Sequence, residues 1–161
     1  MKKKMIIIGG GISGIYLSIL LKKYLDMDVL VLEANDKPLK KVLATGNGRC
    51  NLSNKDLDKS HYDGDIKPWV DDVIHDFDIV EALKDIGLYT KYMGNLLYPY
   101  SESAKAVQTL FLNRASEYGV KIICEEEVLS IKKSKQGYFI HAVHQDYQAD
   151  YVTIACGTPA G

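Results

Sequence analysis

The hydrophobic pattern near the N-terminus predicts a strand–helix–strand unit over residues 1–34. Residues 4–8 form a short apolar run, and a second run, "DVLVLEA", follows at residues 28–34. Continuous apolar runs of this length are typical of central parallel strands, which a sheet buries on both faces. Between the two runs, apolar residues such as Ile15 and Ile19 recur at helical spacing.

The middle of the chain predicts one helix and one hairpin. An amphipathic helix that covers the sheet and ends at Gly87 is predicted from apolar residues at three- and four-residue intervals, namely Val73, Phe77, Val80, Leu83 and Ile86. The tripeptide "MGN" at residues 93–95 separates two short runs and predicts a hairpin turn.

The last third of the chain predicts a helix, a third parallel strand and a meander. Ser101 or Ser103 is expected to cap the helix, which ends at Gly119 and turns inward the apolar residues Val107, Leu110, Phe111 and Ala115. The segment "VKIICEEEV" then predicts a third parallel strand. Three short strands follow, with turns at "KQG" and "HQDY".

A glycine motif connects the first strand to the first helix. Gly9, Gly11 and Gly14 fit G-x-G-x-x-G, and Glu33 stands at the end of the second strand, about 20 positions further on. The first glycine permits a tight turn, the second lets a pyrophosphate approach the backbone, and the third lets helix and strand pack closely. The helix N-terminus favours phosphate, and Glu33 can accept hydrogen bonds from a ribose. Because a carboxylate repels a 2′-phosphate, FAD or NAD is favoured over NADP.

The segment after Glu33 favours FAD over NAD. A plain NAD-binding domain would continue with another helix and strand, whereas residues 34–65 are predicted to form a long loop, and long loops in compact domains are usually functional. Its stretch "LATGNGRCNLSN" is rich in Gly and Asn and holds Arg49. Such a stretch can present backbone N–H groups and a guanidinium to an anion or a ring edge, which suits a cofactor with both a pyrophosphate and a flavin.

Three segments carry a resemblance to a known family. "GGGISG", "LEAND" and "KKVLATGNGRCNLSN" resemble the N-terminal signature of the BaiN-like or YhiN-like flavoproteins, also called aminoacetone-oxidase-family FAD-binding enzymes. The resemblance continues through "NLLYPYSESAKAVQTLFLNRASEYGVKI" and "ADYVTIACGTPAG", and so covers essentially the whole chain. It implies an α/β fold, the glutathione-reductase-type FAD-binding Rossmann-like fold, in which a meander accompanies the parallel sheet.

The resemblance also implies which residues bind the cofactor. Those of the glycine turn face the pyrophosphate, Glu33 binds the adenosine ribose, and Val128 meets the adenine through its backbone. Residues 155–157 pass close to the cofactor. The residues along the pyrophosphate and flavin side are Lys41, Asn47, Arg49, Cys50 and Asn51. The full predicted set is Gly9, Gly11, Ile12, Ser13, Gly14, Glu33, Ala34, Lys41, Asn47, Arg49, Cys50, Asn51, Val128, Ala155, Cys156 and Gly157. Thr158 stands where the family usually has a second glycine.

The chain length predicts one domain, the N-terminal part of an FAD-binding domain. We divide it into the dinucleotide unit at residues 1–34, a cofactor loop with helix and hairpin at 35–100, and the helix, third strand and meander at 101–161. Because complete flavoproteins of the family are longer, the fold is expected to be incomplete at the C-terminus. An uncovered apolar surface would then favour weak FAD binding or self-association.

Composition narrows the choice of partners and compartment. The chain has 20 Lys plus Arg and 21 Asp plus Glu, so nothing in its charge favours a nucleic-acid or membrane partner. The glycines at residues 9–11 interrupt the first apolar stretch, so a soluble protein is predicted. Its 3 cysteines form neither a C-x-x-C pair nor a zinc spacing, which favours the reducing cytoplasm.

The other candidate reactive residues are interpreted as structural or surface residues. His61, Asp63 and Asp65 are interpreted as a solvated turn rather than a metal site, and no metal is predicted. His141 and His144 fall on opposite strand faces and are interpreted as surface or edge residues. Arg49 could lower the pKa of Cys50, but a packing or flavin-facing role for this cysteine is favoured. Cys124 is expected in a buried strand. No catalytic residue is assigned.

The leading functional hypothesis is the FAD-binding portion of a flavin-dependent oxidoreductase. The flavin would carry the hydride chemistry, with NAD(P)H as a candidate electron donor and a small molecule as substrate. Members of the resembled family are linked to reduction of unsaturated steroid-like acids and to amine oxidation. The alternatives are a non-catalytic dinucleotide-binding or assembly module and an NAD-dependent dehydrogenase half.

Overall fold

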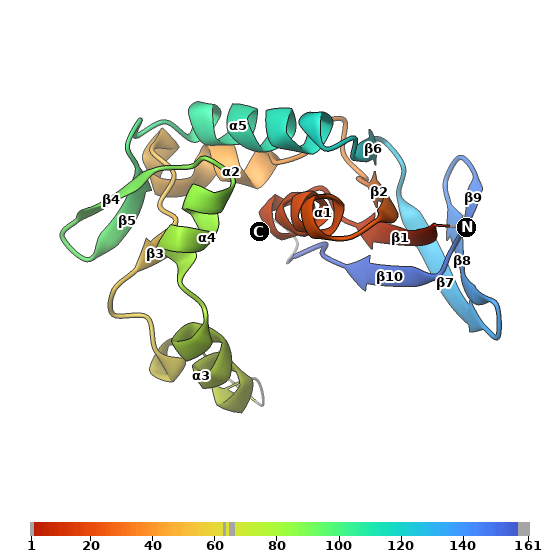
Figure 1. Cartoon of the computed structure of the whole chain (residues 1–161), viewed down its shortest axis with the longest axis horizontal. Helices are drawn as coiled ribbons and strands as arrows, with labels where there is room; N and C mark the ends of the chain where they lie inside the picture. The colour runs from red at the N-terminus through yellow and green to blue at the C-terminus, as the bar shows by residue number, and fades with distance from the viewer. Residues whose placement is uncertain (1, 63, 65–66, 158–161) are drawn as a thin grey trace. The chain divides into compact units, whose positions relative to one another are not determined.

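The computed structural model describes residues 2–62, 64 and 67–157, which belong to two compact units (Figure 1). The first unit comprises Met1–Val42 and Phe111–Gly161, and the second comprises Leu43–Leu110. The helices α2 (Lys40–Ala44) and α5 (Ala104–Glu117) each contain one of the points at which the chain passes between the units.

The first unit is built on a four-stranded parallel sheet with the strand order β10-β1-β2-β6. The strands are β1 (Lys3–Ile8), β2 (Met27–Leu32), β6 (Lys121–Ile123) and β10 (Tyr151–Ile154). The helix α1 (Ile12–Tyr24) connects β1 to β2, so the predicted strand–helix–strand unit is confirmed. The predicted third parallel strand is also confirmed, because β6 pairs with β2.

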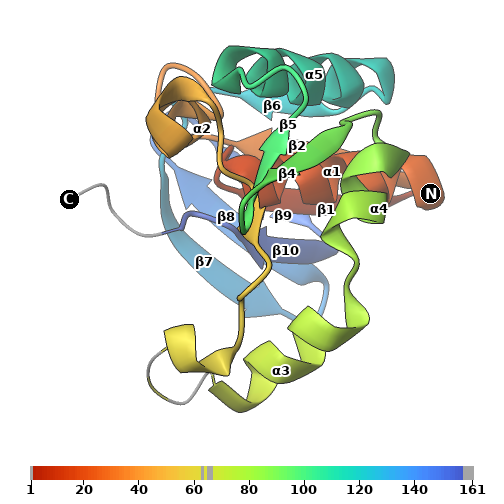
Figure 2. The same cartoon turned by 90° about the vertical axis from the view of Figure 1, so that its left-hand side faces the viewer.

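Both faces of this sheet are covered, as the continuous apolar strands require. One face packs against α1, whose Ile15 and Ile19 are fully buried. The other face forms a core of buried residues with the meander, comprising Ile6, Ile8, Leu30 and Leu32 from the sheet and Ile140, Ala142, Tyr147 and Ala149 from the meander. Figure 2 shows the meander strands beside β10.

The meander consists of the antiparallel strands β7 (Val128–Ser134), β8 (Gly137–Ala142) and β9 (Asp146–Ala149). The predicted turns at "KQG" and "HQDY" are confirmed. The third strand was expected to be one continuous strand of the meander, and this is wrong. The chain changes sheet at Asp150, so that β9 completes the meander and β10 pairs in parallel with β1. The Asp150 carboxylate fixes this corner, since it accepts hydrogen bonds from Lys4 N (2.8 Å) and Lys3 Nζ (2.7 Å).

The second unit contains a three-stranded antiparallel sheet with the order β3-β5-β4. Its strands are β3 (Ser53–Asn54), β4 (Thr90–Met93) and β5 (Leu96–Pro99). The predicted hairpin turn is confirmed, and Gly94 in it has a left-handed φ of 61°. The segment predicted as one long loop also holds α2, the 3₁₀ turns η1 (Thr45–Gly48) and η2 (Lys59–His61), and β3, so it is more ordered than expected.

The prediction of a single amphipathic helix before Gly87 is wrong. The structure has two helices, α3 (Lys67–Asp76) and α4 (Ile79–Asp85), which Figure 1 shows as separate. The Asp78 carboxylate caps α4, because it accepts hydrogen bonds from Val80 N (2.9 Å) and Glu81 N (3.2 Å). Of the residues predicted to face inward, Leu83 on α4 is 7% exposed, whereas Val73 on α3 is 64% exposed.

Other predicted helix boundaries are confirmed. Ser103 caps α5, because its Oγ accepts a hydrogen bond from Ala106 N (3.2 Å). Gly119 follows that helix with a φ of 70°, and Gly87 follows α4 with a φ of 88°. The inward residues Val107, Phe111 and Ala115 are buried, and Leu110 is half-buried. Among the helices of the described residues, none is both long enough and apolar enough to cross a membrane.

The difference in burial between Val73 and Leu83 predicts that their substitutions have unequal effects on stability. Leu83→Ala should lower the free energy of unfolding by about 2–5 kcal/mol, since it removes buried methyl groups. Val73→Ala serves as the matched control and should change it by less than about 0.5 kcal/mol. Urea unfolding followed by circular dichroism measures both. Equal losses from the two variants would contradict the difference in burial between Leu83 and Val73.

Candidate functional site

Three segments of the predicted site meet at the carboxyl edge of the parallel sheet. Backbone hydrogen bonds continue the strand ladder past the strand ends, from Gly9 N to Leu32 O (2.8 Å), from Glu33 N to Ile123 O (2.9 Å) and from Ala155 N to Ile8 O (2.7 Å). Ligands of open α/β sheets bind at this edge. The structure therefore brings together the glycine turn, Glu33 with Ala34, and residues 155–157 of the predicted set.

The three motif glycines have different surroundings. A Cβ atom on Gly9, whose φ is 110°, would lie 2.5 Å from Ala155 O, and one on Gly14 would lie 2.1 Å from Gly9 O. A Cβ atom on Gly11 would come no closer than 3.9 Å to the protein. Gly9 and Gly14 are thus required by packing, whereas Gly11 leaves open space into which a ligand can approach.

The N-terminus of α1 offers hydrogen-bond donors at this open space. The first bond within the helix runs from Ile15 N to Gly11 O (3.0 Å), and its first turn holds no acidic residue. Among the described residues, no side chain caps the helix. Ile12 and Ser13 are exposed. Free N–H groups and the positive end of the helix dipole bind phosphate, so this part of the structure fits the pyrophosphate of a dinucleotide.

Glu33 is held in a defined orientation although it is buried, with 7% exposure. Its Oε2 accepts a hydrogen bond from Gly10 N (2.7 Å), and its Oε1 accepts one from Asn35 N (2.8 Å) and one from Asn35 Nδ2. Gly10 has no room for a side chain, because a Cβ atom there would lie 2.9 Å from Glu33 Oε2. Sequence reasoning missed both Gly10 and Asn35, although the run of three glycines and the segment "LEAND" contain them.

The remaining predicted residues of the first unit lie near the ends of its strands. Lys41 Nζ lies 4.0 Å from the position of a Cβ atom on Gly157. Cys156 is exposed, and its thiol donates to Ile8 O (3.5 Å). Val128 begins β7 and packs against the core between sheet and meander. Thr158 lies outside the described residues. Contact of each residue with the cofactor stays a prediction.

In the second unit, the Gly- and Asn-rich loop is a closed turn. Its residues Gly46, Asn47, Gly48 and Cys50 all have left-handed φ angles. Two N–H groups that were expected to be available to an anion are instead bonded within the loop. Arg49 N donates to Gly46 O and Cys50 N donates to Thr45 O, each over 3.1 Å. Gly46 is required here, since a Cβ atom on it would lie 2.6 Å from Asn51 N.

The side chains of Arg49 and Cys50 have separate environments. The Arg49 guanidinium lies over the Tyr98 ring, 5.2 Å from the ring centroid, which is a cation–π contact. The Cys50 thiol is buried, and this burial raises its pKa, although a hydrogen bond with Thr45 lowers it in part. The hypothesis that Arg49 lowers the pKa of Cys50 is therefore wrong. Asn47, Arg49 and Asn51 are exposed, and their contacts with a cofactor stay predictions.

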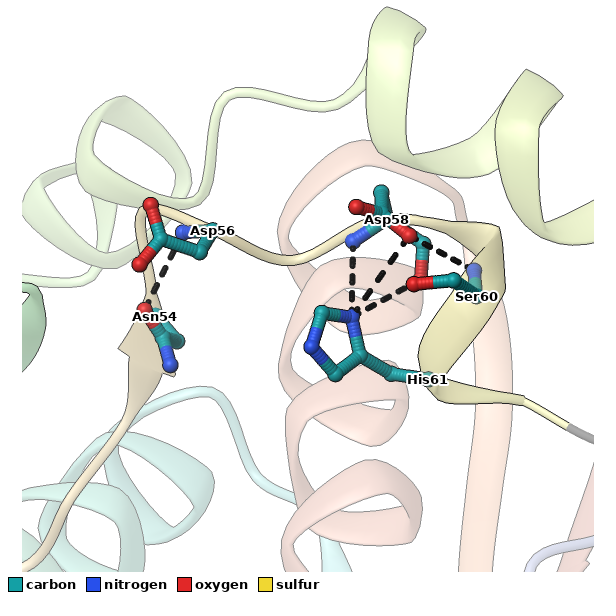
Figure 3. A network of polar contacts seen from close by, with 5 residues as sticks. All are labelled: Asn54, Asp56, Asp58, Ser60 and His61. Atoms are coloured by element: carbon teal, nitrogen blue, oxygen red, sulfur yellow. Dashed lines mark hydrogen bonds and ion pairs between the residues drawn. The ribbon is translucent and has the colours of Figure 1, made fainter.

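The interpretation of His61 as part of a solvated turn is confirmed (Figure 3). Asp58 caps η2 by accepting a hydrogen bond from Ser60 N (2.6 Å), and His61 Nδ1 lies 3.4 Å from Asp58 N. Both side chains are more than half exposed. Asp63 and Asp65 lie outside the described residues. Within the part of the chain that the structure describes, no group of three His, Cys, Asp or Glu side chains could hold a metal ion.

His141 and His144 are exposed residues, as interpreted from the sequence. His141 Nδ1 lies 2.6 Å from Asp146, and His144 Nδ1 lies 3.4 Å from the buried Glu126. Cys124 differs from the expectation, because it follows β6 and is only partly buried. Burial raises the pKa of this thiol, and the carboxylates of Glu33, Asp36 and Glu125 raise it further.

A cavity of about 380 Å³ lies at the opposite, amino edge of the parallel sheet. Lys4, Lys22, Lys121 and Tyr147 are among its lining residues, and none of the predicted site residues lines it. The cavity is therefore separate from the cofactor site.

Comparison with known proteins identifies related sequences. A family model described as "HI0933-like protein Rossmann domain" matches residues 3–160. A 3-dehydro-bile acid delta(4,6)-reductase of Clostridium scindens is 39% identical over 158 residues, which are 96% of this chain and 39% of the relative. A ribosomal RNA dihydrouridine synthase of Haemophilus influenzae is 26% identical over 161 residues, covering 94% of this chain and 39% of that protein. The chain thus spans about two fifths of the length of these relatives.

Solved structures show the same fold. A bacillithiol disulfide reductase from Staphylococcus aureus superposes with a TM-score of 0.53 at 19% identity, and the match covers 98% of this chain and 39% of the other. Together with the parallel sheet and the meander, the likeness confirms the predicted glutathione-reductase-type Rossmann-like fold.

The glycine geometry predicts that two similar substitutions act differently. Gly14→Ala should lower the free energy of unfolding by roughly 3 kcal/mol, because its Cβ atom collides with backbone. Gly11→Ala should change it by no more than about 1 kcal/mol, yet weaken FAD binding by about tenfold or more, since the methyl group enters the ligand's space. Thermal unfolding and quenching of FAD fluorescence measure the two effects. A Gly11→Ala protein with unaltered FAD affinity would refute the assignment of the open space.

The cysteine environments predict an order of thiol reactivity. At pH 8 an aromatic disulfide reagent should modify the exposed Cys156 first and Cys50 last, because Cys50 is buried and its raised pKa reduces its thiolate fraction. Cys156→Ser should remove the fast phase, and Cys50→Ser should leave it intact. The reverse pattern would show that Cys50 is the reactive thiol.

Proposed function

Because the chain belongs to the HI0933-like Rossmann-domain family, we propose that it is the FAD-binding part of a flavin-dependent oxidoreductase. The family resemblance inferred from the sequence is thereby confirmed, and the cofactor is FAD. Bound FAD supplies the hydride transfer chemistry of such enzymes. The activity of the whole protein and its substrate are parts of this proposal.

The observation that carries the proposal is the arrangement of donors and acceptor at the carboxyl edge of the sheet. The open N–H groups at the start of α1 are suited to bind the pyrophosphate, and the Glu33 carboxylate is suited to accept hydrogen bonds from the adenosine ribose. Gly11 leaves the space that the pyrophosphate needs. These residues bind and orient the cofactor, and none of them is assigned as a catalytic acid or base.

We propose that the substrate is a small molecule with a carbon–carbon double bond that the enzyme saturates. The relative that is 39% identical is named as a reductase of a bile acid, and the name of the other relative describes formation of dihydrouridine in ribosomal RNA. Both names fit addition of a hydride and a proton across a double bond, with NAD(P)H as the proposed source of the electrons. The balanced charge of this chain favours the small molecule over RNA.

We further propose that the protein works in the cytoplasm. Its cysteines form no disulfide, which agrees with a reducing compartment. Self-association through an uncovered apolar surface stays a prediction.

The test of the proposed function begins with the colour of the purified protein. A yellow protein that releases FAD on denaturation and is bleached by NAD(P)H without oxygen supports the proposal. Release of NAD would support the dehydrogenase alternative. If the protein binds FAD but does not catalyse reduction of any unsaturated substrate by a reductant, the non-catalytic alternative is supported.

Substitution of Glu33 tests the ribose contact. Glu33→Gln should weaken FAD binding by about tenfold, because a carboxylate accepts stronger hydrogen bonds than an amide does. Glu117→Gln, at an exposed position on α5, is the matched control and should bind FAD normally. Equal FAD affinity in both variants, with both shown to be folded by circular dichroism, would contradict the ribose assignment.

A further inference from the structure

The Glu33 carboxylate receives unequal numbers of hydrogen bonds at its two oxygens. Oε1 accepts both the backbone N–H and the side-chain amide of Asn35. Oε2 accepts one hydrogen bond, from Gly10 N at 2.7 Å. A carboxylate oxygen has two lone-pair positions, so the described protein groups fill those of Oε1 and leave one at Oε2.

Asn35 is itself fixed by the segment that follows β6. Its carbonyl oxygen accepts a hydrogen bond from Glu125 N (2.9 Å), and the carbonyl oxygen of Glu33 accepts one from Glu126 N (2.9 Å). The turn from Glu33 to Asn35 is therefore held by backbone bonds on either side of Ala34. A side chain on such a fixed backbone can orient its neighbour at little cost in conformational entropy.

We infer that Asn35 is a positioning residue for the adenosine ribose: it occupies Oε1 of Glu33 and leaves Oε2 to accept the ribose hydroxyl. This inference rests on FAD binding by the proposed function. Without the Asn35 amide, Oε1 loses one of its two donors, and the carboxylate can rotate away from the orientation that the ribose needs. Asn35 acts only through Glu33.

Replacement of the amide by a carboxylate gives a test that a purely structural role would not pass. In Asn35→Asp, two carboxylates face each other, and this repulsion raises the pKa of the pair above the usual value of about 4. Below that raised pKa the pair shares one proton and regains the missing donor. Among the charged groups nearby, Glu125 donates its backbone N–H to Asn35, Asp36 is ion-paired with Lys40, and Glu126 faces His144.

The experiment measures FAD affinity by fluorescence quenching between about pH 8 and about pH 5.5 in four proteins. These are the unaltered protein, Asn35→Ala, Asn35→Asp and the control Asn113→Asp, whose exposed position on α5 undergoes the same change of charge. At pH 8 we expect about tenfold weaker binding for Asn35→Ala and a larger loss for Asn35→Asp. Binding by Asn35→Asp should recover as the pH falls, and Asn113→Asp should follow the unaltered protein.

Two results would overturn the inference. One is unaltered affinity in Asn35→Ala, and the other is a loss in Asn35→Asp that does not recover at low pH. Failure of the proposed function is a separate outcome, because the unaltered protein would then bind no FAD at any pH.

Discussion

The structure depends on the continuation of the parallel ladder beyond the ends of its strands. Hydrogen bonds to Leu32, Ile123 and Ile8 hold Gly9, Glu33 and Ala155 at one edge, and each belongs to a segment of the cofactor site. Two of these bonds join the end of β1 to β2 and β10, and the third joins β2 to β6, so they can form only if all four strands pair in register. The site is therefore a direct consequence of strand pairing, and the buried cores on the two faces of the sheet stabilise it.

Local patterns were sufficient to predict the elements whose signals lie within a few residues. The first strands, the glycine turn, the hairpin and the α5 boundaries follow from apolar runs, glycines and a serine cap. Asp150 shows the limit, because the change from meander to parallel sheet depends on its contacts with Lys3 and Lys4, far away in sequence. The break between α3 and α4 had a local signal in Asp78 and Glu81, a capping pattern, but the apolar spacing concealed it.

The sequence placed the glycine turn and Glu33 in one candidate site, but it did not show the contacts within that site. The spacing from the glycine motif identified Glu33, but only folding brings Gly10 and Asn35 onto its two oxygens. The Gly- and Asn-rich loop was expected to offer backbone N–H groups. Because several of its residues are left-handed, two of these N–H groups instead donate to carbonyl oxygens of the loop itself. The Arg49 guanidinium lies over the ring of Tyr98, which belongs to a hairpin distant in sequence. A loop's composition does not specify whether its donors are used internally.

The pairing of β1 with β10 has a consequence for biosynthesis. Met5 lies opposite Tyr151, so one edge of β1 has no partner until β10, the last described strand, has been translated. Loop closure over such a separation is slow, and an unpaired apolar edge is prone to aggregation in the meantime. The nascent chain therefore has a long interval in which a chaperone that binds apolar strands would protect it.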